Sequence, residues 1–98
     1  LSSTTEAIRN LSRSLPDRIL VYMFGSALRN GSHRDIDLLF VWSGDTVDYM
    51  WLRDLIWQTT EELESTLGES VDATVLTNLE EQEMSFINRT SAQLIVLA

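Results

Sequence analysis

The sequence contains no cysteine and no lysine, only one proline, and no long hydrophobic run. The lack of cysteine excludes disulfide bridges and metal sites built on thiolates. No stretch approaches the roughly 20 consecutive apolar residues of a membrane-spanning helix. The first residues also lack the basic and apolar pattern of a secretion leader. We therefore expect a cytoplasmic protein that does not contact a membrane.

Positive charge is also scarce. Seven arginines face 15 acidic residues, which gives a net charge of −8. A chain this acidic repels a nucleic acid backbone, so direct binding of DNA or RNA is not expected. If the chain binds a polyphosphate, then metal ions, helix N-termini or well-placed arginines must offset the repulsion.

The chain has 98 residues, 44% of them apolar, and this size fits a single domain over residues 1–98. Alternating helix-like and strand-like segments predict an α/β (α+β) fold, a sheet covered by helices. Strands are expected where short, mainly apolar runs are bounded by turn residues, at 18–24, 35–42 and 70–76. Helices are expected at 3–14, 27–30, 47–67 and 79–90. Residues 93–97 form either a short last strand or the end of that final helix, and we favour the strand.

The predicted helix over 47–67 carries more aromatic residues than its buried stripe requires. Leucine and isoleucine recur at helical spacing, whereas Trp51 and Trp57 lie off that stripe. Aromatic residues are common at interfaces, but a small domain also uses them in its own core. We expect one of these tryptophans in the core and the other at an interface.

Two aspartates open the predicted second strand, as Asp35-Ile36-Asp37, and five apolar residues follow them. Residues two apart on a strand point to the same side, so the two carboxylates should lie close together. Like charges that close need compensation, and a divalent cation with oxygen ligands, Mg²⁺ or Mn²⁺, provides it. The alternative is a solvated strand edge, which so short a pattern also fits.

Two further features complete a candidate site. Gly25-Ser26 follows the first strand directly, where glycine lets another group approach the backbone and a serine at a helix N-terminus suits phosphate. Asp72 interrupts the apolar third strand, and a buried carboxylate there would need a partner. Placing that strand beside Asp35 and Asp37 would bring three carboxylates together. Taken singly, these features also fit an ordinary turn and an exposed position on an edge strand.

Together, a buried strand, Gly-Ser, Asp-x-Asp opening an apolar strand, and a lone aspartate in a third strand resemble the nucleotidyltransferase superfamily that includes DNA polymerase β. The short length is similar to its minimal MNT-type members, which are often paired with HEPN-domain toxins. The resemblance covers residues 18–76 and implies a nucleotidyltransferase-like fold, with a small mixed sheet of three to four strands covered by helices. It also implies roles for the acidic residues. Asp35 and Asp37 would bind two metal ions, and Asp72 would hold the catalytic metal and help to activate the acceptor hydroxyl.

The same resemblance implies a phosphate-binding segment. Gly25 and Ser26 would hold the triphosphate of ATP or of another nucleoside triphosphate. Arg29 matches an arginine often found after Gly-Ser in this family, which either contacts phosphate or pairs with an acid. The loop between Ser26 and Asp35 has eight residues, fewer than in many minimal members, and a shorter loop can change how phosphate is held.

The resemblance implies an Mg²⁺-dependent enzyme that transfers a nucleoside monophosphate, AMP from ATP, to a hydroxyl of a partner protein. The partner would be a HEPN-type toxin, with this chain as its antitoxin. The chain has no room for the second domain of larger relatives, so the acceptor surface must come from the partner or from a homo-oligomer. One alternative is a catalytically weak or silent partner-binding module of the same fold. Another is a small-molecule transferase, such as one modifying aminoglycosides, although the missing second domain argues against it.

Overall fold

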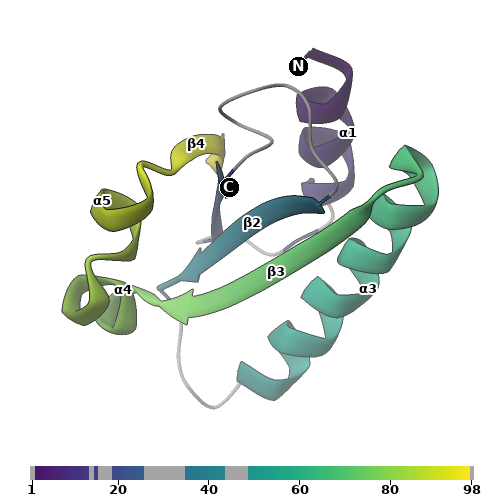
Figure 1. Cartoon of the computed structure of the whole chain (residues 1–98). Coiled ribbons are helices and arrows are strands. Elements are labelled where there is room, and N and C mark those ends of the chain that lie inside the picture. The colour runs from purple at the N-terminus through teal and green to yellow at the C-terminus, as the bar shows by residue number, and fades with distance from the viewer. Residues whose placement is uncertain (1, 14, 16–18, 26–34, 44–48, 98) are drawn as a thin grey trace.

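A computed structural model gives the fold and describes residues 2–13, 15, 19–25, 35–43 and 49–97 (Figure 1). The predicted short helix over 27–30 lies outside these residues, as do Ser26 and Arg29. The four predicted strands and three longer helical segments all fall largely within them, so most of the predicted element order can be compared with the structure.

The strands form one mixed sheet in the order β3-β2-β1-β4. β1 pairs antiparallel with both β2 and β4, whereas β2 and β3 run parallel. A parallel pair needs a long crossover connection, and a helix between β2 and β3 supplies it. The prediction of a mixed sheet, with the last strand included, is confirmed. The strands are β1 (Ile19–Phe24), β2 (Asp35–Trp42), β3 (Ser70–Thr77) and β4 (Gln93–Leu97).

The helices divide between the two faces of the sheet. α1 and α3 pack together on one face, and α3 runs along β3 (Figure 1). α4 and α5 follow β3 and contact the other face. No helix within the described residues is long and apolar enough to cross a membrane. The bounds are α1 (Ser2–Ser12), α3 (Tyr49–Leu67), α4 (Asn78–Met84) and α5 (Phe86–Thr90).

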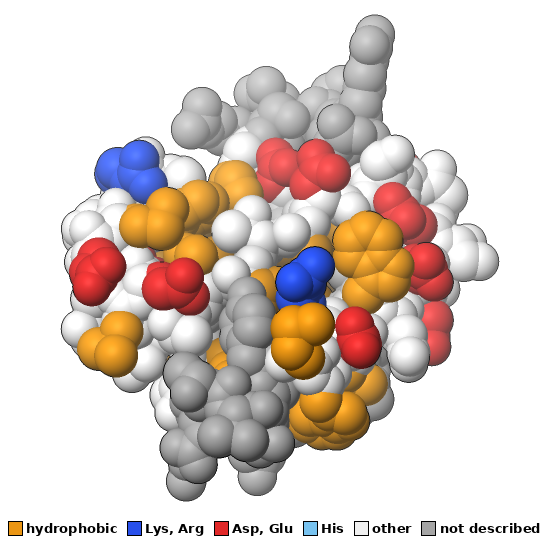
Figure 2. Space-filling view, turned by 90° about the horizontal axis from the view of Figure 1, so that it is seen from below, with side chains coloured by type: hydrophobic (Ala, Val, Ile, Leu, Met, Phe, Trp, Pro, Cys, Tyr) orange, Lys and Arg blue, Asp and Glu red, His pale blue; other side chains and the backbone are white. Residues whose placement is uncertain are grey.

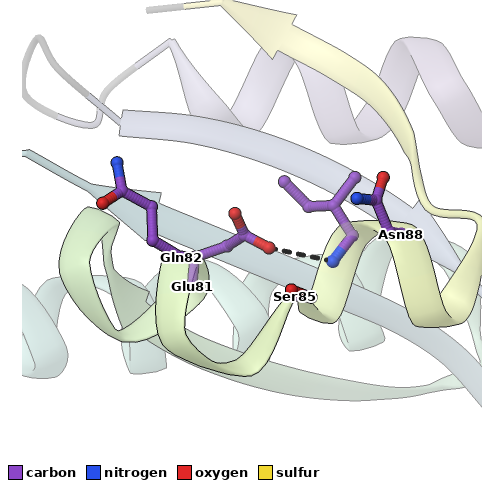
Figure 3. A pocket seen from close by; sticks show the side chains of 5 residues that line it. Glu81, Gln82, Ser85 and Asn88 are labelled. Atoms are coloured by element: carbon purple, nitrogen blue, oxygen red, sulfur yellow. Dashed lines mark hydrogen bonds between the residues drawn. The ribbon is translucent and has the colours of Figure 1, made fainter.

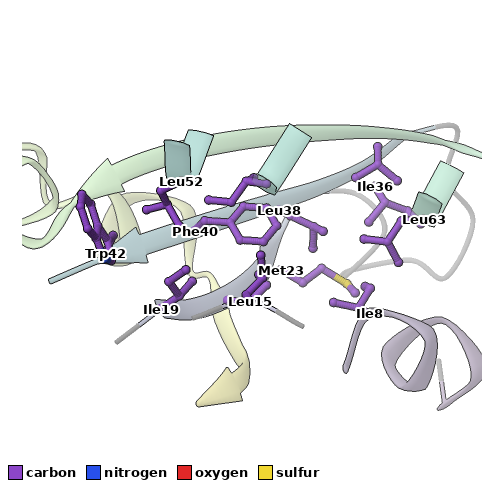
Figure 4. Packing of buried hydrophobic residues seen from close by; sticks show 13 residues of the cluster. Ile8, Leu15, Ile19, Met23, Ile36, Leu38, Phe40, Trp42, Leu52 and Leu63 are labelled. Carbon is purple, nitrogen blue, oxygen red and sulfur yellow. The ribbon is translucent and has the colours of Figure 1, made fainter. Parts of the chain in front are cut away.

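The main hydrophobic core lies between the sheet and the pair α1 and α3 (Figure 4). Strand residues at alternate positions point into it, as the side-chain period of two requires. Helix residues at spacings of three and four meet them, which confirms the predicted stripe on α3. The fully buried side chains of this core include Ile8, Ile19, Val21, Met23, Ile36, Leu38, Phe40, Leu52, Ile56 and Leu63.

A smaller cluster forms on the opposite face, where α4 and α5 cover part of the sheet. Phe24 at the end of β1 meets Phe86 at the start of α5, with ring centroids 5.0 Å apart and planes at 84°. This edge-to-face contact fixes α5 against the end of β1. The buried members of the cluster are Leu39, Val41 and Leu76.

The prediction of one continuous helix over 79–90 is wrong, because Ser85 divides it. Ser85 adopts the left-handed conformation, with φ 50°, and its N–H donates to the carbonyl oxygen of Glu81 at 2.7 Å. The carboxylate of Glu81 then accepts from the N–H of Ile87 at 3.0 Å. The chain can therefore turn within one residue, so that Phe86 reaches the sheet, which a straight helix would not permit.

The prediction that one of the two α3 tryptophans is buried is also wrong. Trp51 is 60% exposed and Trp57 is 65% exposed. The indole N–H of Trp57 donates to Glu61 Oε1 at 3.1 Å along the helix surface. Leucine and isoleucine already fill the buried stripe of α3, and the aromatic side chains of the main core, Phe40 and Trp42, come from β2.

Candidate functional site

The sheet register brings two of the predicted acidic residues together. Asp37 of β2 pairs with Asp72 of β3. Neighbouring strands lie about 4.8 Å apart, and residues in register on them present their side chains on the same face. Asp37 is half-buried and Asp72 is exposed. The prediction that the third strand lies beside the one carrying Asp35 and Asp37 is therefore confirmed, and Asp72 also lies on an edge strand.

Asp35, the third predicted acid, is the first residue of β2 and pairs with Ser70. Its side chain lies outside the described part of the structure. Among the side chains that are described, no three from histidine, cysteine, aspartate and glutamate converge closely enough to hold a metal ion. Because the Asp35 side chain is not among them, a site formed by Asp35, Asp37 and Asp72 is not tested, and the three-carboxylate site remains a prediction.

Gly25 lies against the carboxylate of Asp37. Its φ of +83° is in the left-handed region, which L-residues other than glycine adopt only with strain. A Cβ atom at this position would overlap Oδ2 of Asp37 and would lie 3.2 Å from its Cγ. The sequence predicted close approach of another group to this glycine, and within the described residues that group is the Asp37 side chain. Ser26 and Arg29, which come next in the predicted phosphate segment, lie outside the described residues.

An aromatic wall borders this pair of acids on the β1 side. Phe24 pairs with Asp37 in the antiparallel register of β1 and β2, so a row of Phe24, Asp37 and Asp72 crosses the sheet. Phe86 of α5 covers Phe24. Sequence reasoning missed this wall, because the contact joins segments far apart in the chain. The row is thus apolar at one end and open at the β3 edge.

Tyr22 lies on the same face as this row, two residues before Phe24 on β1. Burial raises the pKa of its phenol above the usual value of 10.0, and the negative charge of Glu81 raises it further. The phenol therefore keeps its proton to a higher pH in the folded chain than in the unfolded one.

Two surface hollows are formed by described residues. One lies at the junction of α4 and α5, with a volume of about 340 Å³, and includes the hydrogen bond from Ile87 to Glu81 (Figure 3). None of the described site residues predicted from the sequence lines it. The other lies between α3 and the edge of β3, has a volume of about 350 Å³, and includes Asp72. Its lining is Trp57, Thr60, Glu61, Glu64, Val71, Asp72 and Ala73.

No protein-family model and no curated protein matches the sequence. Solved structures do match. A chain in the crystal structure of a toxin–antitoxin with AMP-PNP aligns with a TM-score of 0.62 and 20% identity, over 96% of this chain and 73% of that one. A chain in the complex of tri-AMPylated Shewanella oneidensis HEPN toxin with MNT antitoxin aligns at 0.60 and 18%, over 99% and 72%. A chain of the toxin–antitoxin MntA–HepT aligns at 0.60 and 16%, over 100% and 74%.

Identities this low establish similarity of fold and not of activity. The alignments extend over nearly the whole chain, so the similarity includes the helices on both faces of the sheet. The chain therefore shares its fold with a chain in each of these toxin–antitoxin structures.

Proposed function

We propose that this chain is a metal-dependent nucleotidyltransferase that transfers AMP from ATP to a hydroxyl group of a partner protein, as the antitoxin of a HEPN-type pair. The observation that carries the proposal is the pairing of Asp37 with Asp72, with Gly25 held against the Asp37 carboxylate. Facing acids on neighbouring strands repel each other, which a structural role would avoid. A site for cations explains why both are present.

The residues fit a divalent cation. The donors are carboxylate oxygens, which Mg²⁺ and Mn²⁺ prefer, and Asp35 precedes Asp37 by two positions on the same strand. Bound at Asp35, Asp37 and Asp72, such ions would offset the charge of the triphosphate and lower the pKa of the acceptor hydroxyl. A chain of net charge −8 needs that compensation to bind ATP.

The chain itself would position the reactants. Gly25 has no side chain, so a phosphate group can approach the backbone beside Asp37. Ser26 and Arg29 remain the predicted contacts to the triphosphate. Asp72 is exposed at the β3 edge, so an acceptor hydroxyl from another protein can reach it and transfer a proton to its carboxylate.

The choice of nucleotide and acceptor rests on the fold comparison. One structure with this fold contains AMP-PNP, and another pairs an MNT antitoxin with a tri-AMPylated HEPN toxin. ATP as donor and a protein hydroxyl as acceptor are the assignments that these two findings favour for this chain.

A silent partner-binding module is the second candidate. Asp72 is exposed on an edge strand, where a solvated carboxylate has no need of a metal, and the loop before Asp35 is short. In this case the chain would bind its partner without modifying it.

Label transfer separates the two candidates. The chain is incubated with Mg²⁺, with the protein encoded by the adjacent reading frame, and with ATP labelled on either the α- or the γ-phosphate. Label from the α-phosphate only, lost in Asp37→Asn and kept in Asp54→Asn, would support the transferase. Asp54 is an exposed acid on α3 and serves as the matched control. A stable complex without transfer of either label would favour the silent module.

A further inference from the structure

In the part of the chain that the structure describes, the outer edge of β3 has unpaired peptide groups in its middle, whereas side chains hydrogen-bond to the backbone near both of its ends. The N–H of Val71 donates to Glu64 Oε2 at 2.9 Å, so it points away from β2. The N–H of Thr77 likewise donates to Glu80 Oε1 at 3.0 Å. Because peptide groups alternate in direction along a strand, Ala73 and Val75 also direct their N–H and C=O groups outward. Within the described residues no hydrogen bond to these outward groups is formed.

An edge strand with unpaired peptide groups is a template for another strand. Proteins usually protect such an edge against pairing with another strand, and Glu64 and Glu80 protect this one only near its ends. Ala73 is exposed and has the smallest side chain that keeps a strand regular. An incoming backbone can therefore approach Ala73 and Val75 closely, as strand-addition sites require.

The hollow between α3 and this edge gives the incoming strand a defined chemistry. We call it the α3–β3 groove; its walls are the Trp57 indole and the Glu61 carboxylate on the helix, and Asp72 and Ala73 on the strand. The indole face attracts a cation, and the carboxylates of Glu61 and Glu64, which line the same groove on α3, strengthen that attraction. Acidic side chains lie beside apolar ones on the side of the molecule that α3 forms, on the right of Figure 2.

We propose that the α3–β3 groove binds an extended, basic segment of a partner protein, which adds to the middle of β3 and places an arginine or lysine beside Trp57. Charge complementarity selects this occupant. A second copy of this chain would bring its own acidic edge, since the chain carries a net charge of −8 and no lysine.

The groove also joins the two faces of the molecule. Asp72 lines it and is paired with Asp37 on the face of the candidate site. A segment bound along β3 would therefore bring the neighbouring residues of the partner chain close to Asp37 and Asp72. That acceptor-presenting role rests on the proposed transferase function, whereas binding of the segment does not.

The test uses two eight-residue peptides, one that alternates arginine with valine and one that alternates glutamate with valine. Calorimetry should show that only the arginine peptide binds, and amide exchange at Ala73 and Val75 should slow. Glu61→Gln keeps an acceptor for the Trp57 N–H but removes the charge, so binding should weaken about threefold to tenfold. Glu62→Gln, the same change at an exposed position outside the groove, should bind as the wild type does.

Ala73→Pro removes one outward N–H and leaves the pairing of β2 with β3 intact, because proline is tolerated on the open side of an edge strand. It should weaken peptide binding at least about tenfold. Equal binding of both peptides, or unchanged binding by Ala73→Pro and Glu61→Gln, would overturn the proposal. So would a wild-type dimer that Ala73→Pro converts to a monomer, since the groove would then bind a second copy. Peptide binding by Asp37→Asn should be normal, so failure of ATP binding and failure of the groove are separate results.

Discussion

Gly25 and Asp37 are fitted to each other: the left-handed glycine leaves the space that the Asp37 carboxylate occupies. Any side chain at position 25 would meet both a strained backbone and that carboxylate. A link of this kind couples the end of β1 to the first acids of β2. It also makes a direct test of the site geometry possible through unfolding measurements.

Gly25→Ala is expected to lower the free energy of unfolding by about 1–3 kcal/mol, from backbone strain together with overlap. In an Asp37→Ala background the same change should cost only about 1 kcal/mol, because only the strain remains. Urea unfolding of the four variants in this cycle gives the two values. Equal costs in both backgrounds would show that residue 25 does not press on Asp37.

Asp72→Asn should separate stability from function. Without divalent cations it should raise the free energy of unfolding by about 0.2–1 kcal/mol, because a like-charge pair across β2 and β3 is removed. Added Mg²⁺ should raise the Tm of the wild type more than that of the variant. Asp54→Asn, an exposed acid on α3, provides the control. If Mg²⁺ stabilises the wild type and Asp72→Asn equally, Asp72 is not part of the cation site.

Some parts of the fold and of the candidate site could be predicted from the sequence alone. The strand containing Asp72 was predictable as the neighbour of β2. A carboxylate within an apolar strand is unfavourable unless it belongs to a site, and Asp35 and Asp37 on β2 indicated such a site. The stripe on α3 was predictable from helical spacing alone. The first inference uses one pairing between two segments, and the second uses a pattern within a single segment.

Three-dimensional contacts limited the rest. The break at Ser85 accompanies the contact between Phe86 and Phe24, which lie too far apart in the sequence for a local pattern to reveal it. Serine also rarely adopts the left-handed conformation, so Ser85 itself gives no signal of a break. Trp51 and Trp57 are both exposed because leucine and isoleucine fill the buried stripe of α3, while Phe40 and Trp42 of β2 provide the aromatic side chains of the core. Side-chain bulk alone could not decide which tryptophan would be buried.

Ser85 provides a prediction with a definite sign. If the helix breaks at Ser85 in solution, then Ser85→Gly should be more stable than Ser85→Ala by about 1 kcal/mol, because glycine adopts positive φ without strain. In a continuous helix alanine would instead be favoured, by about 1 kcal/mol. Thermal unfolding of the two variants should therefore distinguish a broken helix from an unbroken one.

Tyr22 should make the fold sensitive to alkaline pH. Its pKa is raised in the folded state by burial and then by Glu81, so the folded chain holds the phenol proton at pH values where the unfolded chain has lost it. Stability is therefore unaffected below the unfolded pKa of 10.0 and is lost as pH rises from there toward the raised folded value. Tyr22→Phe should remove that loss.

The measurement is urea unfolding across the alkaline range, with phenolate absorbance recorded in parallel. The absence of lysine and cysteine leaves few other groups that titrate there. Glu81→Gln should give a smaller alkaline loss than the wild type, because the charge is the second cause of the shift. A wild-type loss that Tyr22→Phe leaves unchanged would assign the effect to another group.

The most direct test of the central claim is calorimetry of ATP binding with and without Mg²⁺, on the wild type, Asp37→Asn and the control Asp54→Asn. We expect Mg²⁺-dependent binding in the wild type and the control, and none in Asp37→Asn, with all three folded. Binding that needs no metal, or that Asp37→Asn retains, would contradict a nucleotide site built on the Asp37–Asp72 pair.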